Sequence, residues 1–166
     1  MKSNRHLSPI MQTVFLIALL ALAGCASRGD VVRHGFGFDF ISDSPDAVLL
    51  DYRYGQSRNP VRNPVAMANR GESNQGNGVF GAMLRGDELY VKWRLKETGQ
   101  VFEETVDLKS RLPADIENCD VYFLVRGAQL YVYLITPHKR EKGEPSNGPS
   151  KWSFRRILTL YPDSAK

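Results

Sequence analysis

The segment Leu89–Leu108 alternates apolar and polar residues, and this period of two constrains the fold of the chain more than any other feature. Successive side chains of a β-strand point to opposite faces, so the alternation predicts two strands that are each buried on one side. Thr98 and Gly99 interrupt the alternation and predict a hairpin with a loop of two residues, or of four. The two-residue loop pairs Leu95 with Phe102 on the buried face.

The polar face of this hairpin helps to choose its register. The two-residue loop sets Arg94 opposite Glu103, and such a cross-strand pair of opposite charges is worth up to about 1 kcal/mol. A three-residue loop would set Arg94 against Phe102 and lose this match. Glu104 is anomalous, because it shares the apolar face and lies opposite Trp93. We interpret Glu104 as marking the margin of the sheet, with a carboxylate at a partly closed surface as the alternative.

A second hairpin is predicted between the segments Asp120–Arg126 and Gln129–Ile135, which flank Gly127-Ala128. Glycine at the first central position is typical of a type II′ turn. This turn places Val125 opposite Leu130. All the residues on that face of the hairpin are then apolar: Val121, Phe123, Val125, Leu130, Val132 and Leu134.

The opposite face of the second hairpin is also largely apolar. Strands that are apolar on both faces belong in the middle of a layered fold, so this second face needs a cover. A second core layer beneath a loop or the C-terminal strand is the favoured cover. A partner protein is the alternative, because tyrosines are enriched at protein interfaces. The candidate partner-binding residues of this face are Tyr122, Leu124, Tyr131 and Tyr133.

Other segments carry weaker patterns. Phe36, Phe38 and Phe40 alternate with small or polar residues, which predicts a strand with all three rings on one face. Residues 44–46 predict a turn, and residues 114–119 a single helical turn. Two more strands are expected from apolar residues of shared parity, namely Val48, Leu50, Tyr52 and Tyr54 in the first and Trp152, Phe154, Leu158 and Leu160 in the last.

Between Gly55 and Gly78 the alternation gives way to Asn, Gly, Pro, Arg and Ser. A loop of more than about 15 residues is uncommon in a compact domain and is usually functional or mobile. Arg58 and Arg62 are candidate contacts for an acidic partner protein, and a solvated, mobile loop is the favoured interpretation. Residues 137–151 form a second irregular stretch that we expect to be exposed.

These patterns together predict an all-β fold. The chain shows no long amphipathic helix, no heptad and no domain-sized repeat. Several short alternating segments separated by turn residues are typical of an antiparallel sandwich or a curled meander sheet. We expect one domain with about six to eight strands.

The N-terminal segment predicts export. Lys2 and Arg5 precede an apolar run, Met11–Ala23, which is shorter than the roughly 20 residues that span a bilayer as a helix. This order of basic, apolar and small residues is typical of a secretory signal. The tetrapeptide Leu22-Ala23-Gly24-Cys25 resembles the lipobox of bacterial lipoproteins. An ordinary cleaved signal with an incidental cysteine is the alternative.

The lipobox resemblance implies a domain organisation and an address. Residues 1–24 would be a signal peptide that is cleaved before Cys25, and Cys25 would carry the acyl chains. Residues 25–33 would form the lipidated tether and residues 34–166 the single β-rich domain. Ala26 after the lipidated cysteine implies sorting to the periplasmic face of the outer membrane.

Charge and cysteine content limit the classes of function. The chain has 22 Lys and Arg residues against 18 Asp and Glu, and Lys2 and Arg5 belong to the signal, so the exported domain is only slightly basic. We therefore expect no nucleic-acid partner. With Cys25 lipidated, Cys119 has no intramolecular disulfide partner. A small buried hydrophobe is its favoured interpretation, and a reactive thiol or an intermolecular disulfide is the alternative.

No pattern of catalytic residues stands out. His34 and His138 are isolated in the sequence, and two lone histidines make a poor metal site. A nucleophilic Cys119 assisted by His138 would need the fold to join distant segments. Glu103 and Glu104 are adjacent in a strand and point to opposite faces, so they do not form an acid/base pair. We therefore expect no catalytic residues, no metal site and no cofactor.

The strand motifs of the domain carry a second resemblance. They are Val91 and Trp93, Val106 and Leu108, Leu112-Pro113, and Val121-Tyr122-Phe123. They resemble those of small proteobacterial lipoproteins encoded beside type VI secretion lipase effectors. The resemblance implies a non-catalytic, outer-membrane-anchored periplasmic protein that binds another protein, as an immunity or inhibitor partner of an envelope-targeting effector. A structural or assembly lipoprotein of a cell-envelope or secretion complex is the alternative.

Overall fold

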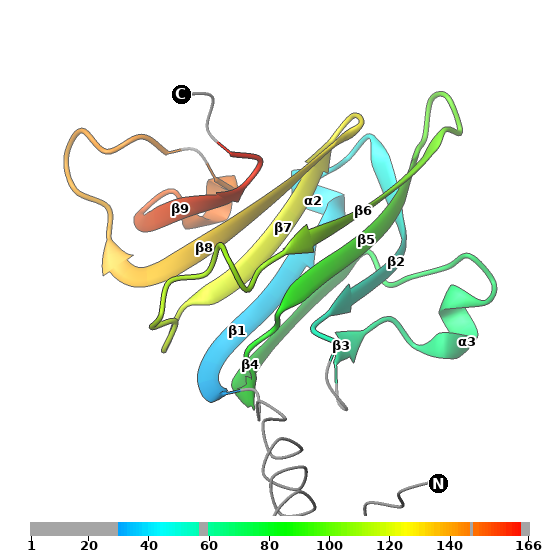
Figure 1. Cartoon of the computed structure of the whole chain (residues 1–166). Coiled ribbons are helices and arrows are strands. Elements are labelled where there is room, and N and C mark those ends of the chain that lie inside the picture. The colour runs from blue at the N-terminus through cyan, green and yellow to red at the C-terminus, as the bar shows by residue number, and fades with distance from the viewer. Residues whose placement is uncertain (1–29, 57–59, 147, 164–166) are drawn as a thin grey trace, which may run out of the picture.

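The computed structural model describes residues 30–56, 60–146 and 148–163 and shows two β-sheets packed face to face (Figure 1). The five-stranded sheet has the spatial order β4 (Gly76–Leu84), β1 (Val31–Asp39), β7 (Asp120–Arg126), β8 (Gln129–Lys139) and β9 (Arg155–Tyr161). The four-stranded sheet has the order β3 (Val61–Arg62), β2 (Ala47–Tyr54), β5 (Glu88–Leu95) and β6 (Val101–Asp107). The short helical elements are α2 (Phe40–Asp43), α3 (Val65–Ala68) and the 3₁₀ turn η1 (Ser150–Trp152).

This architecture confirms the predicted all-β sandwich, with three differences in detail. The nine strands within the described ranges exceed the expected number, chiefly because the glycine-rich β4 and the two-residue β3 were not anticipated. The sheets are also not purely antiparallel, since β1 pairs with β7 in parallel. In addition, β1 begins at Val31, before the start expected at residue 34, so the ordered domain extends into the expected tether.

The β1 strand confirms the predicted aromatic face. Phe36 and Phe38 point into the space between the sheets, and Phe40 follows them as the first residue of α2. All three rings are only 1% exposed. They surround Phe123 of β7, whose ring centroid lies 4.9 Å from that of Phe38. The core is therefore centred on aromatic contacts between β1 and β7.

In β2 the expected face is half wrong. Tyr52 and Tyr54 do point into the core, but Ala47 and Leu49 precede them there, in place of Val48 and Leu50. The cause is a register shift against β5 between Leu49 and Asp51. A bulge inserts one extra residue into a strand, which reverses the parity of the side chains on either side of it.

The β5–β6 hairpin has the four-residue loop, 96–99. The Leu95 N–H donates to the Gln100 carbonyl at 2.9 Å, and the Gly99 N–H donates to the Leu95 carbonyl at 3.0 Å. Trp93 consequently lies opposite Phe102, with ring centroids 5.6 Å apart. The expected pairing with the two-residue loop is wrong, although the inner and outer faces are as predicted.

The same register changes the charged pairs of this hairpin. Glu103 lies opposite Lys92, at 3.3 Å between Oε2 and Nζ, and not opposite Arg94. Glu104 lies opposite Val91 on β6, the edge strand of its sheet. There it accepts a hydrogen bond from the Tyr161 hydroxyl of β9, and this bond raises the pKa of Tyr161. Glu104 thus marks the open margin between the two sheets, as the sequence indicates.

The β7–β8 hairpin is confirmed residue by residue. Val125 pairs with Leu130, and Arg126 with Gln129. Gly127 has a φ of 57°, the positive value that the first position of a type II′ turn requires. The inward face of this hairpin belongs to the main core.

Two segments with little predicted structure contain ordered elements. The stretch expected to be one long loop includes β3, α3 and the start of β4, and Gln75 fastens it by accepting from the Leu49 N–H at 2.9 Å. Residues 114–119 form no helix. They turn instead through Asn118, whose φ is 57°.

The last strand begins later than expected. Trp152 belongs to η1, and β9 starts at Arg155. Leu160 points into the core, whereas Leu158 and Phe154 are 39% and 56% exposed. A register shift against β8 near Thr159 separates these residues, so one parity does not hold along the strand.

Among the described helices, none is long and apolar enough to cross a bilayer.

His34 is fully buried at the end of the sandwich where β1 begins. Its Nε2 lies 2.8 Å from the Tyr54 hydroxyl, and its Nδ1 lies 2.9 Å from the Val32 carbonyl. Burial lowers the pKa of His34 below its ordinary 6.5. The folded protein therefore binds fewer protons than the unfolded chain once the pH falls below about 6.5.

We expect this group to make the domain less stable at mildly acidic pH. The free energy of unfolding should fall with decreasing pH below about 6.5, by up to about 1.4 kcal/mol per pH unit from this residue. Urea unfolding between pH 7.5 and 5.5 measures the slope. His34→Gln should flatten the slope, and His138→Gln, at an exposed position, is the matched control. Equal slopes in the wild type and in His34→Gln would contradict this account.

Candidate functional site

The residues predicted to contact a partner do not form one exposed surface. Arg58 lies outside the described residues, as does Cys25, the predicted lipidation site, and Arg62 is exposed on the short strand β3. Tyr122, Leu124 and Tyr133 are at most 3% exposed, and Tyr131 is half-buried. The interpretation of this tyrosine face as a partner-binding surface is therefore wrong for its three buried members.

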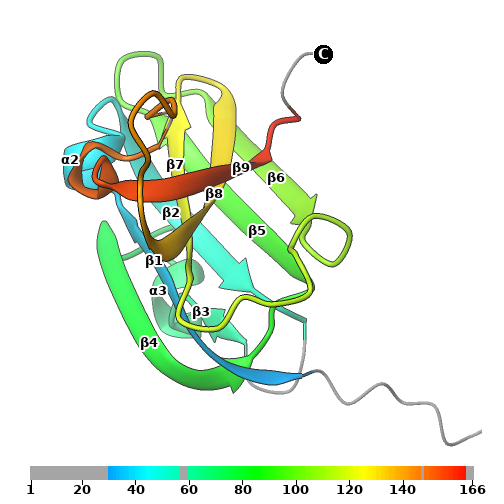
Figure 2. The ribbon, with the colours of Figure 1, turned by 90° about the vertical axis from the view of Figure 1, so that its left-hand side faces the viewer.

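The tyrosine face is instead a second core layer on the outer side of the five-stranded sheet. After β8 the chain returns over this face, and Trp152 and Ile157 pack against it. Figure 2 shows β9 and the segment before it lying in front of β7 and β8. The Tyr122 hydroxyl donates to Asp43 Oδ2 at 2.8 Å, so its polar tip is also satisfied within the chain.

A different surface is open, namely the outer edge of β4. Natural edge strands usually resist pairing with other chains by carrying charges or proline, or by being very short. In the described part of the chain, β3 has only two residues, β6 carries Glu103, Glu104 and Asp107, and β9 carries two arginines and is followed by Pro162. The nine-residue β4 contains neither a charged residue nor a proline.

The pairing of β4 with β1 identifies the backbone groups that are free. At one end of the pair the Arg85 N–H donates to the Asp30 carbonyl at 2.9 Å. At the other end the Phe40 N–H donates to the Gln75 carbonyl at 2.7 Å. Because bonding alternates along an antiparallel strand, the odd-numbered residues of β4 face β1 and the even-numbered ones face away. Within the described ranges, no hydrogen bond involves the backbone of these outward residues, Gly76, Gly78, Phe80, Ala82 and Leu84.

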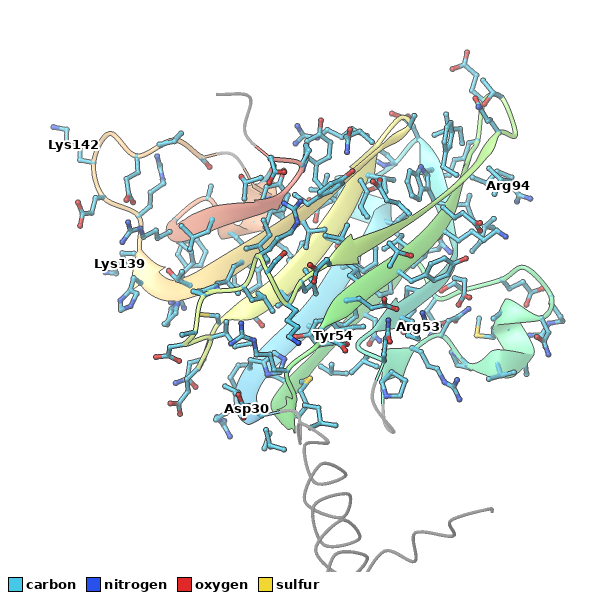
Figure 3. All side chains as sticks on the ribbon, in the orientation of Figure 1. Asp30, Arg53, Tyr54, Arg94, Lys139 and Lys142 are labelled. Carbon is cyan, nitrogen blue, oxygen red and sulfur yellow. The ribbon has the colours of Figure 1, made fainter. Side chains whose placement is uncertain are left out.

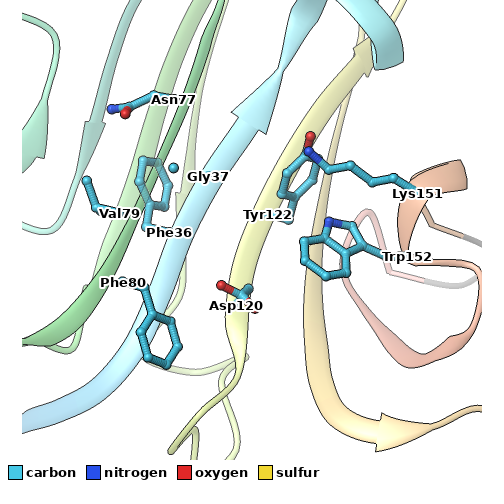
Figure 4. Close-up of a pocket in the computed structure, with 10 residues that line it drawn as sticks. Phe36, Gly37, Asn77, Val79, Phe80, Asp120, Tyr122, Lys151 and Trp152 are labelled. Atoms are coloured by element: carbon cyan, nitrogen blue, oxygen red, sulfur yellow. The ribbon is translucent and has the colours of Figure 1, made fainter.

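A shallow groove of about 210 Å³ runs beside this edge on the outer face of the five-stranded sheet (Figure 4). Its floor is bare, because Gly37 of β1 and Gly78 of β4 are paired and neither has a side chain. Phe80 forms one wall and is 51% exposed. Tyr122 and Trp152 form the opposite wall. The glycines that weaken β1 and β4 as strands thus create the groove.

One carboxylate lies in this groove. Asp120 opens β7 beside Gly35, and its side chain lies over the glycine, since a Cβ there would be 1.7 Å from Asp120 Oδ1. No described residue gives Asp120 a side-chain hydrogen bond or an ion pair. Burial raises the pKa of Asp120, against the opposing effect of the Arg155 and Lys151 charges. The carboxylate is therefore partly desolvated and has no direct side-chain partner among the residues that the structure describes.

The neighbouring polar groups of the groove leave this carboxylate free. The Lys151 ammonium lies 4.7 Å from the ring centroid of Tyr122, which is a cation–π contact. The Trp152 Nε1–H is buried and has no acceptor among the described residues. The sequence offered no signal for this groove, because its residues come from β1, β4, β7 and η1.

The remaining chemistry-bearing residues do not join the groove. His34 is on the inner face of β1, and His138 is exposed near the end of β8. Cys119 is 7% exposed in the main core, as its interpretation as a buried hydrophobe predicts, and burial raises the pKa of its thiol. In the described ranges, no three His, Cys, Asp or Glu side chains are placed to hold a metal ion. The arrangement is suited to binding an extended chain along β4.

The fold and these surfaces define a β-sandwich with one unprotected edge and an adjoining side-chain groove. Comparisons of the chain with protein-family models, with curated proteins and with solved structures found no match.

Proposed function

We propose that this chain is a non-catalytic protein-binding lipoprotein of the cell envelope that docks an extended segment of its partner along β4. The observation that carries the proposal is the unprotected outer edge of β4. Strand addition to such an edge supplies affinity through backbone hydrogen bonds, and the neighbouring side chains supply specificity. Five outward residues offer donors and acceptors over the length of an ordinary strand.

The proposed lipid anchor would place this edge near the membrane. Cys25 precedes Asp30 by a segment that spans at most about 18 Å when fully extended. Val31 at the start of β1 pairs with Leu84 at the end of β4, so both lie at the anchored end of the sandwich. Asp30 and Arg94 mark opposite ends in Figure 3. The Leu84 end of the β4 edge would therefore lie close to the outer membrane, and the Gly76 end would point into the periplasm.

The partner that fits this placement is a protein that acts on the envelope. An immunity or inhibitor protein fixed at the inner surface of the outer membrane would meet such an effector where it acts. Pairing with a strand of the effector would hold it away from its substrate. This interpretation extends the resemblance of the strand motifs to lipoproteins encoded beside type VI secretion effectors.

A competition experiment tests the proposed function. Cells that lack the chain should be killed by sibling cells that deliver the cognate effector, and the wild-type chain should restore survival. Ala82→Lys places a charge beside the free β4 groups at an exposed position, so it should abolish protection and weaken binding to the purified effector by about 100-fold. Isothermal titration calorimetry measures the affinity.

The matched control is Thr105→Lys on β6, an exposed position on an edge that already carries charge. This variant should protect as well as the wild type. Full protection by Ala82→Lys would refute docking along β4. Survival of cells that lack the chain would favour the structural or assembly role instead.

A further inference from the structure

We infer that the segment docked along β4 places an arginine or lysine side chain in the adjoining groove, against the Asp120 carboxylate. This inference rests on the proposed function and adds a requirement on the sequence of the partner. It assigns a binding site to Asp120, Phe80, Trp152 and the glycine floor, none of which the sequence indicates as a contact for a partner. Three features of the groove support it: its distance from an added strand, the open path to the carboxylate, and the carboxylate's lack of a cationic partner.

The spacing between strands sets the distance that a side chain of the docked segment must span to reach Asp120. A strand added outside β4 would lie about 4.8 Å from it, and alternate side chains would point to the outer face. The Asp120 side chain leans from β7 onto β1, over Gly35. The gap between the added strand and the carboxylate is therefore about two strand spacings, or about 10 Å. Only a long side chain such as arginine or lysine crosses this gap.

Glycines leave an open path from the β4 edge to the carboxylate. A Cβ built on Gly78 meets no atom within 4 Å, so the surface of β4 is open at this position. Gly37, its pair on β1, continues the bare floor. The two glycines lie two residues along their strands from Gly35 and Phe80, so they leave room beside Phe80 for a side chain directed across the sheet to Asp120. Figure 4 shows Gly37, Phe80 and Asp120 around this space.

Both aromatic walls already contact cations of this chain, because Arg33 Cζ lies 5.0 Å from the Phe80 ring centroid and the Lys151 ammonium 4.7 Å from that of Tyr122. Walls of this kind are compatible with a cation and its apolar stem.

The unpaired carboxylate of Asp120 favours a positive charge on the docked side chain. Asp120 is partly desolvated, and a buried or half-buried carboxylate without donors is unfavourable. Lys151 rests on Tyr122, and neither Lys151 nor Arg155 makes an ion pair with Asp120. A cationic side chain would provide the missing donors. A glutamate would be repelled, and a neutral aliphatic chain would cover the carboxylate without bonding it.

Three designed peptides test the inference with the full-length chain in detergent micelles. Each has nine residues that alternate threonine and valine, with arginine, citrulline or glutamate at the central position and a fluorescent label. Citrulline keeps the shape of arginine and removes its charge. Fluorescence anisotropy should show that the arginine peptide binds about 10-fold more tightly than the citrulline peptide, and that the glutamate peptide binds most weakly.

Variants locate the effect. Asp120→Asn should reduce the ratio of arginine to citrulline affinity to about 1, because the amide keeps the shape of the carboxylate and removes its charge. Asp107→Asn on the β6 edge is the matched control and should keep the ratio. Ala82→Lys should weaken all three peptides. This last result reports on strand docking independently of the groove.

The outcomes separate the two proposals. Equal binding of the arginine and citrulline peptides to the wild type would overturn the role of the groove and leave docking along β4 intact. An unchanged ratio in Asp120→Asn would overturn the assignment to this carboxylate. Failure of all three peptides to bind would overturn this inference together with strand docking itself.

Discussion

Replacing Phe123 with alanine is expected to lower the free energy of unfolding by about 3–5 kcal/mol. The Phe123 side chain has no exposed surface and lies at the centre of the aromatic core. Its ring centroid is 5.8 Å from that of Phe36, 4.9 Å from that of Phe38 and 6.0 Å from that of Phe40. Truncation removes all these contacts and leaves a cavity that strands of two sheets cannot collapse to fill.

Urea unfolding followed by circular dichroism measures this loss. Phe154→Ala is the matched control, because it removes the same ring from a side chain that is 56% exposed. We expect that control to change stability by less than about 1 kcal/mol. Equal losses in the two variants would contradict the placement of the core around Phe123.

Replacing Leu124 with alanine is expected to cost about 2–5 kcal/mol of stability, although Leu124 lies outside the main core. Its side chain is 1% exposed, on the outer face of β7. It belongs to the second core layer, against which Trp152 and Ile157 pack. Stability is expected to fall because the C-terminal segment buries Leu124 as fully as the facing sheet buries a residue of the main core.

The same urea experiment with Leu158→Ala provides the comparison, since Leu158 is 39% exposed on β9. That variant should lose less than half as much stability as Leu124→Ala. If Leu124→Ala kept the full stability and instead weakened effector binding, the outer face of β7 would be an interface. The second core layer would then be the wrong account.

Predictions from the sequence succeeded where local pattern alone determines the structure. The β7–β8 register follows from one glycine turn, because Gly127 adopts the positive φ that the turn requires. In the β5–β6 hairpin the faces were predicted and the register was not, because loops of two and four residues preserve the same parity. The stacking of Trp93 on Phe102 accompanies the longer loop.

The failures have different physical causes. The β2 bulge at Leu50 reverses parity without any change in composition that the pattern would reveal. The strand β4 was missed because three of its nine residues are glycine, which supplies no hydrophobic periodicity. Nothing in Gly76–Leu84 read alone indicates a strand, and its order comes from pairing with β1.

The candidate site was predicted least well. The tyrosine face was correctly recognised as requiring a cover, and the second core layer was the favoured cover. The groove could not be predicted, since Asp120 and Phe80 are forty residues apart in the sequence. They line one groove only because β1 pairs with β4 on one side and with β7 on the other. Parallel pairing of β1 with β7 is a long-range choice that no local pattern records.

The sequence by itself determined which residues share a face wherever a strand runs without a bulge, because the face then depends only on the alternation of neighbouring side chains. It determined the all-β class, the aromatic face of β1 and the type II′ turn at Gly127. The tertiary structure alone decided what covers each face and which strand remains at an edge. Those outcomes depend on contacts between distant segments, such as Trp152 over Tyr122, whose formation reflects the packing of the whole chain. The open edge of β4 and the free carboxylate of Asp120 follow from that packing.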